Sequence, residues 1–145
     1  MSRLNESQRA TFFKLREALD DFVTQIADVP QKVNQYAEAV RAWKPGVYSA
    51  GDVRSENGVP YKCVQAHDST ANPGWKPSAT ASLWMQYHGT TPDTARAWVA
   101  PTGSHDMYLA GEYMIWTDGN IYLCKQDTPY SPDVYAAAWE LYSPV

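Results

Sequence analysis

The sequence is short of cysteine, of basic residues and of long apolar runs, and each shortage excludes a class of protein. Its 145 residues carry 12 basic and 16 acidic side chains, a net charge of −4, so no global positive field favours nucleic acid. No apolar run approaches the roughly 18 residues of a membrane span, and we expect neither membrane insertion nor a secretory signal. Two cysteines cannot form the disulfide framework of a small secreted domain. We therefore expect a chain held together by burial or by self-association.

Phenylalanine is absent after the first 22 residues, and tryptophan and tyrosine replace it. All six tryptophans and nine of the ten tyrosines lie in residues 43–145. Their rings can stack while an N–H or O–H remains available to a polar partner, which suits recognition as well as small cores. The same part of the chain becomes acidic towards its end, because residues 98–145 hold one basic and six acidic side chains.

The first 42 residues predict a helical stem. Asn5 or Ser7 can cap the start of the first helix, and Gln8, three residues after Asn5, comes close to a capping box. Asp28 before Pro30 is typical of the start of a second helix. We expect helices at about 7–28 and 30–42. Apolar residues recur in steps of three and four, the heptad spacing of a coiled coil, at Phe12, Leu15, Leu19, Phe22, Ile26, Val29, Val33, Tyr36, Val40 and Trp43.

Two ways of burying this apolar stripe remain open. In the first, parallel stems of several chains associate across a proline kink, and the large seam residues favour a homotrimer. The residues expected in that seam are Phe12, Leu15, Leu19, Phe22, Ile26, Val33, Tyr36 and Val40. In the second, the helices fold back on one another or on the later part of the chain, as an ordinary amphipathic lid would.

The rest of the chain is an internal repeat. Gly-x-x-Tyr-x-Cys-x-Gln occurs at residues 58–65 and again at 119–126, and Trp-x-x-Tyr closes both copies at 84–87 and 139–142. Asn57-Gly58 and Asp118-Gly119 are strong signals for β-hairpins. The sequence thus predicts an α+β chain, with a coiled-coil-like stem at 1–42 and two small antiparallel β-rich modules. The modules are the first repeat at 43–89 and the second repeat at 98–145, joined by a linker at 90–97.

The repeat resembles the chitin-type carbohydrate-binding modules of families five and twelve. The matching residues are Trp43, Tyr48, Gly51, Asp52, Asn57, Gly58, Tyr61 and Trp84 in the first repeat, and Trp98, Tyr108, Gly111, Glu112, Gly119, Tyr122 and Trp139 in the second. The resemblance covers roughly 100 residues and implies short β-rich units that recognise polysaccharide.

One variant of the motif looks like the form carried by tail-associated proteins of bacteriophages and prophages. It consists of Tyr-x-Cys-x-Gln-Ala-His at 61–67, followed by Trp75-Lys-Pro77, and residues 4–9 before the first helix also resemble those proteins. The resemblance implies a virion protein, assembled in the host cytoplasm and exposed on the released particle, whose partners are host-surface or cell-wall glycan and other virion proteins.

Sugar recognition needs exposed aromatic faces with a few polar groups beside them. Trp75, in the longer loop of the first repeat, is the leading candidate, with Tyr61 and His67 near it in sequence. Burial of its indole beneath the loop is the alternative. In the second repeat the candidates are Tyr113, Trp116, Tyr130 and Tyr135, which can equally form a protein interface.

No motif for chemistry accompanies these aromatics. Cys63 and Cys124 hold equivalent places in the repeats, so we expect two separate buried thiols. The histidines lack metal-ligand spacing, and no glycosidase-like carboxylate pair or phosphate-binding glycine loop occurs. We expect no cofactor, no metal and no catalysis. The function predicted is glycan binding by a virion protein; a purely structural virion protein and a targeting subunit of a chitinase or lytic enzyme are the alternatives.

Overall fold

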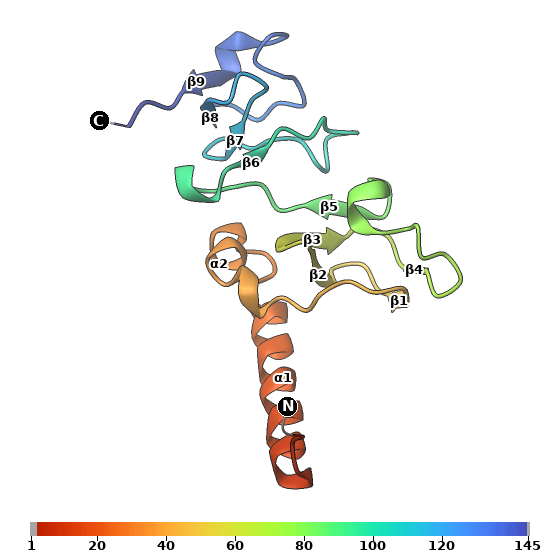
Figure 1. Cartoon of the computed structure of the whole chain (residues 1–145). Helices are drawn as coiled ribbons and strands as arrows, with labels where there is room; N and C mark the ends of the chain where they lie inside the picture. The colour runs from red at the N-terminus through yellow and green to blue at the C-terminus, as the bar shows by residue number, and fades with distance from the viewer. Residues whose placement is uncertain (1–2, 145) are drawn as a thin grey trace.

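The computed structural model describes residues 3–144 and has an α+β architecture, in which a helical segment precedes two small β-rich units (Figure 1). Residues 1, 2 and 145, which the expected stem and second repeat include, lie outside the described residues. The helix α1 (Glu6–Ile26) projects from the molecule, and α2 (Pro30–Gln35) follows it beside the first repeat. In residues 3–144 no helix is long and apolar enough to cross a membrane.

The start of α1 confirms the expected capping box. The Asn5 side chain accepts a hydrogen bond from the Gln8 N–H at 2.8 Å, and the Gln8 side chain accepts one from the Asn5 N–H at 2.9 Å. These two bonds satisfy backbone donors that the first turn of a helix leaves unpaired. The helix ends at Ile26, two residues before the expected end.

The second helix differs from the expectation of a single helix over 30–42. It ends at Gln35, and a 3-10 turn follows at Ala37–Ala39. The chain must then become extended, because the Trp43 N–H donates to the Ser55 carbonyl at 2.7 Å. Asp28 is not the cap: Val29 holds that position, and the Asp28 carboxylate pairs with Lys62 at 2.8 Å.

The two helices pack on the first repeat rather than continuing one seam. Val23, Ile26, Val33 and Val40 form one buried cluster with Val53 and Tyr87, which belong to the first repeat. The expectation that Ile26, Val33 and Val40 serve oligomerisation is therefore wrong, because these side chains are buried within their own chain.

The other residues expected in the seam have mixed surroundings. Phe22 is partly buried, and its ring meets that of the exposed Tyr36 edge-on at 5.1 Å. Phe12 and Leu15 are 60% exposed and Leu19 is 40% exposed, so an apolar stripe remains open on the outer part of α1.

The first repeat contains a three-stranded antiparallel sheet and a two-stranded ribbon. The sheet has the order β2 (Val53–Glu56), β3 (Val59–Cys63), β5 (Trp84–Gln86), and the ribbon pairs β1 (Val47–Tyr48) with β4 (His67–Asp68). The hairpin between β2 and β3 turns at Asn57 and Gly58, with φ of 51° and 78°. Positive φ at both central positions matches the expected Asn-Gly turn.

The second repeat contains a four-stranded sheet with the order β6 (Arg96–Ala97), β7 (Tyr113–Ile115), β8 (Ile121–Cys124), β9 (Trp139–Leu141). Its backbone repeats that of the first. Cys63 pairs with Trp84 and Cys124 with Trp139, while Gly51 and Gly111 have φ of 96° and 95° and donate to the two cysteine carbonyls at 2.8 Å. Gly58 and Gly119 also share a positive φ.

Both repeats begin earlier than expected, at an Arg-Ala-Trp sequence. Trp98 donates to the Ile115 carbonyl at 2.9 Å, as Trp43 does to Ser55, so the segments at 41–43 and 96–98 run along equivalent strands. From here on, the first repeat denotes residues 41–88 and the second repeat residues 96–144.

The segment 90–97 is not a free linker. It holds a capped 3-10 turn at Pro92–Thr94 and strand β6. The Arg96 guanidinium donates to the Tyr87 carbonyl and, at 2.8 Å, to the Asn34 side chain, and His88 meets Glu112 at 2.8 Å in a buried pair. The second repeat is thus fastened to α2 and to the end of the first.

The two cysteines are separate and buried, as expected. Each Sγ donates to the carbonyl of the Gln two residues later, at 3.2 Å for Cys63 and 3.1 Å for Cys124. Burial raises the pKa of both thiols, to about 11 for Cys124, so they behave as small apolar side chains rather than nucleophiles.

Candidate functional site

The loop that carries Trp75 connects β4 to β5 and is held by its own hydrogen bonds. The buried Ser69 donates to the Gly46 carbonyl at 3.0 Å, and the Trp75 N–H donates to Asn72 at 3.0 Å. On the far side of the loop, Ser78 donates twice to the Glu56 carboxylate, at 3.0 Å and 2.7 Å. The loop is therefore fastened at both ends to the body of the first repeat.

Trp75 is the exposed tryptophan of residues 3–144. Its side chain is 40% exposed, whereas Trp84 and Trp139 are 2% and 6% exposed. The other three tryptophans are partly buried against the two repeat cores. The indole is thus not enclosed beneath its loop, and a rigid support presents an aromatic face to solvent.

Tyr61 and His67 both lie beside Trp84 in the first repeat. Tyr61 is 9% exposed and lies in the core of the first repeat with Trp84, and burial raises its pKa. The His67 Nδ1 lies 2.7 Å from the Gln65 carbonyl oxygen, and its ring meets that of Trp84 edge-on. Burial removes Tyr61 from the expected sugar contacts, whereas the role of the partly exposed His67 stays a prediction.

The second repeat presents tyrosines on the corresponding loop. Tyr130 is 55% exposed and Tyr135 is 37% exposed. Their positions are fixed, because Trp139 donates its indole N–H to the Tyr130 carbonyl at 3.0 Å and Gln126 donates to the Tyr135 hydroxyl at 3.0 Å. The loops at equivalent places in the two repeats therefore each expose aromatic rings.

The other two candidates of the second repeat lie elsewhere. Trp116 packs on the core cluster and meets Trp98 edge-on at 5.6 Å. Tyr113 is in strand β7 and meets Tyr142 edge-on at 6.0 Å, on the sheet face away from that core. Neither ring extends the surface of Tyr130 and Tyr135.

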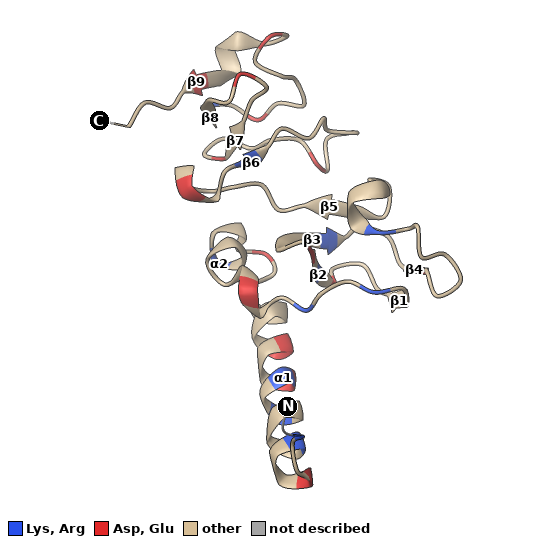
Figure 2. Ribbon diagram, viewed as in Figure 1, with Lys and Arg blue, Asp and Glu red and all other residues tan. Residues whose placement is uncertain are grey.

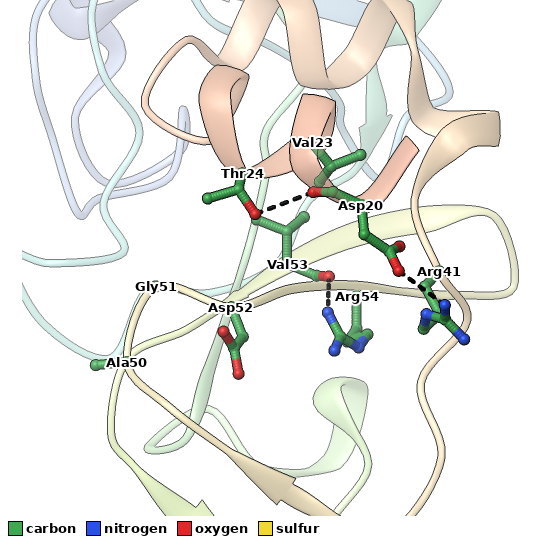
Figure 3. Close-up of a pocket in the computed structure, with 9 residues that line it drawn as sticks. All are labelled: Asp20, Val23, Thr24, Arg41, Ala50, Gly51, Asp52, Val53 and Arg54. Atoms are coloured by element: carbon green, nitrogen blue, oxygen red, sulfur yellow. Dashed lines mark hydrogen bonds and ion pairs between the residues drawn. The ribbon is translucent and has the colours of Figure 1, made fainter. Parts of the chain in front are cut away.

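A polar hollow at the base of α1 was not anticipated from the sequence (Figure 3). It measures about 350 Å³ and is lined by Asp20, Val23, Thr24, Arg41, Ala50, Gly51, Asp52, Val53 and Arg54. The repetition of Arg-Ala-Trp is the sequence signal that could have marked Arg41 as a structural residue.

The charges of this hollow are largely paired. Asp20 binds Arg16 and Arg41, both at 2.7 Å. Partial burial opposes ionisation of Asp20, but the hydrogen bonds and charges of Arg41 and Arg16 outweigh it and lower the pKa. Arg54 donates to the Val53 carbonyl at 2.7 Å and lies over the Tyr48 ring. Asp20 is therefore held as a carboxylate and is not poised as a general acid. Residues 3–144 contain no cluster of three or more metal-ligating side chains.

Comparison with known proteins bears on the first repeat. Residues 42–85 match the model of carbohydrate-binding module family 5/12. This match supports a carbohydrate-binding module at residues 42–85. The match includes the whole Trp75 loop and ends before the second repeat.

The similar proteins are mainly chitinases. Chitinase Chi52 of Paenibacillus xylanexedens is 40% identical over 67 residues, 41% of this chain and 12% of that protein. Chitinase A1 of Niallia circulans is 46% identical over 47 residues, which are 32% of this chain and 6% of that protein. Streptogrisin-C of Streptomyces griseus is 42% identical over 45 residues, which are 30% of this chain and 9% of that protein. The chain thus spans at most 12% of the length of these relatives. A solved family GH18 chitinase from Chromobacterium violaceum is 27% identical, with a TM-score of 0.31, over 42% of this chain and 16% of that one.

Proposed function

We propose that the chain is a non-catalytic protein that binds an insoluble polysaccharide of the chitin class through the Trp75 loop. The exposure of Trp75 on a fastened loop carries the proposal, because the C–H face of a pyranose packs on an open aromatic ring. The family match of residues 42–85 and the chitinases among the relatives support the choice of polysaccharide.

We further propose that the second repeat supplies a weaker contact through Tyr130 and Tyr135. Two linked sites on one chain raise the effective concentration of the second contact once the first is made, so avidity can exceed the affinity of either site. A polysaccharide surface, which offers many identical sites, is the ligand for which this arrangement is most useful.

Two settings for this binding remain proposals. The chitinase relatives favour a role in targeting a chitinase or lytic enzyme to its substrate. The motif variant at 61–67 and the projecting α1 favour the tail-associated virion protein predicted from the sequence, which would bind glycan on the host surface. The proposed sugar site is the same in both settings.

Adsorption of the full chain to insoluble chitin tests the proposal, with deacetylated chitin and cellulose as comparison polymers. We expect Trp75→Ala to weaken adsorption about tenfold, because an open ring contributes about 1.5 kcal/mol when buried. Phe13→Ala is the matched control: it removes an aromatic ring that is 67% exposed but lies on α1. Unchanged adsorption of Trp75→Ala, or equal loss in the control, would exclude Trp75 from the site.

A further inference from the structure

One face of the sheet in the second repeat lacks the α-helical cover that the first repeat has, and its large apolar side chains are only partly buried. Its inner side chains Met114, Cys124 and Trp139 are buried in the repeat core. We call the side chains that alternate with them the open face: the partly buried Tyr113, Ile115, Ile121, Leu123 and Tyr142, with the exposed Glu140 opposite Leu123. A hollow of about 240 Å³ at its edge is lined by Leu123, Glu140, Leu141, Tyr142 and Ser143.

In the first repeat, the equivalent face is covered by the helices. Val53 and Tyr87, which correspond to Tyr113 and Tyr142, are buried against Val23, Ile26 and Val33. The buried Tyr87 hydroxyl donates to the Ala27 carbonyl at 2.7 Å, at the end of α1. Lys62, which corresponds to Leu123, pairs with Asp28. The same backbone surface is thus already a helix-docking face in this molecule.

The outer part of α1, residues 6–19, has apolar side chains that no sheet face covers within residues 3–144. Phe12, Leu15 and Leu19 recur at the spacing of three and four residues that Val23 and Ile26 continue where α1 meets the first repeat. A hollow of about 250 Å³ lies along this stretch, lined by Leu4, Ser7, Gln8, Thr11, Phe12 and Leu15. Large apolar side chains this exposed favour association with an apolar partner.

The two segments that carry these surfaces have opposite net charge. Residues 3–19 hold four basic and two acidic side chains, whereas residues 98–144 hold one basic and six acidic ones. Figure 2 shows these charges on the far part of α1 and around β7–β9. Two acidic second repeats would repel one another, while an outer α1 beside an acidic second repeat gains attraction.

The α1 helix of the same chain cannot reach its own open face. It leaves the first repeat in the direction opposite to β7–β9, as Figure 1 shows. We propose that the outer part of α1 docks on the open face of a second chain, so that chains associate head to tail. Such a contact joins two different surfaces, and it either closes into a ring or continues as an open assembly. This association is independent of the sugar site.

Light scattering on the full chain, without polysaccharide, tests the contact. The variants are Leu15→Lys on α1 and Leu123→Lys on the open face; a lysine stands at the equivalent place in the first repeat, so strand β8 tolerates it. Val134→Lys is the control, because Val134 is 68% exposed in a loop of the second repeat. We expect oligomers for wild type and Val134→Lys and monomers for each single variant.

Mixing the two variants gives the decisive result. The Leu123→Lys chain retains a functional α1 and the Leu15→Lys chain a functional open face, so the equimolar mixture should form dimers and nothing larger. A bundle of parallel α1 helices predicts instead that Leu123→Lys remains oligomeric and that mixing restores nothing, which would overturn the proposal. A monomeric wild type would overturn it as well. Chitin adsorption of the monomeric variants reports on the sugar site separately.

Discussion

The first and second repeats have the same backbone framework and different surroundings. Both place a glycine turn, a buried cysteine and a buried tryptophan at equivalent positions, with the same hydrogen bonds between them. In the first repeat the outer sheet face is covered by helices, and in the second it is open. The two repeats therefore differ in their loops and in what covers their outer faces, whereas the glycine, cysteine and tryptophan positions of the inner core are shared.

The largest effects should come from the shared core. Trp84→Ala and Trp139→Ala should each lower the free energy of unfolding by about 3 to 5 kcal/mol, because each removes a buried indole and leaves a cavity. Urea unfolding measures both, and Trp75→Ala, which should cost less than about 1 kcal/mol, is the control. A comparable loss in the control would mean that Trp75 belongs to the core.

The two equivalent arginines should differ in their contributions. Arg96→Met removes the guanidinium donor of the Tyr87 carbonyl and of the Asn34 Oδ1 in a partly buried site, at a cost of about 2 to 4 kcal/mol. Arg41→Met breaks a pair with Asp20 whose side chains are 40% and 37% exposed, which should cost less than about 1 kcal/mol. Equal costs in urea unfolding would contradict the view that only the second repeat depends on its arginine.

The two equivalent tyrosines test the covered and the open face. Tyr87→Phe should cost about 1 to 2 kcal/mol, because the buried Ala27 carbonyl loses its donor. Tyr142→Phe should change stability by less than about 0.5 kcal/mol, since its ring is partly exposed. Thermal unfolding of both variants at low protein concentration measures the difference, and a reversed order would be inconsistent with the assignment of the two faces.

The smallest effect concerns Asp20. Asp20→Asn should cost less than about 1 kcal/mol at pH 7, because the ion pairs of Asp20 are half exposed. The pKa of Asp20 is lowered by folding, so its stabilisation is present above the ordinary value of 3.8 and is lost as the pH falls through the lower folded value. Unfolding measured from pH 7 to pH 2 should therefore show the variant and wild type converging in acid. A difference that grew in acid would mean that the pKa is raised.

Local signals in the sequence predicted the elements well. The Asn5 cap, the Asn57-Gly58 turn and the equivalent cysteines are confirmed, because each depends on residues that are close in sequence. The prediction of one helix over residues 30–42 was wrong, because Trp43 pairs with β2. Helical periodicity does not show a contact with a strand that is distant in sequence.

The exposure of the candidate side chains was predicted in part. Trp75, Tyr130 and Tyr135 are exposed on fastened loops, whereas Tyr61 is buried. Nearness in sequence grouped Tyr61 with Trp75, but side chains in a strand alternate between two faces, and Tyr61 points to the core face.

The sequence by itself determined the helix cap, the glycine turns and the repeated spacing of tyrosine, cysteine and tryptophan, because these features act through neighbouring residues. Only the tertiary structure decided which apolar side chains of the helical segment are buried. Ile26, Val33 and Val40 have the same spacing as Phe12, Leu15 and Leu19, yet the first set is buried on the first repeat and the second remains exposed. Periodicity shows that a helix has an apolar face, but burial depends on which surface comes within contact distance once the chain has folded.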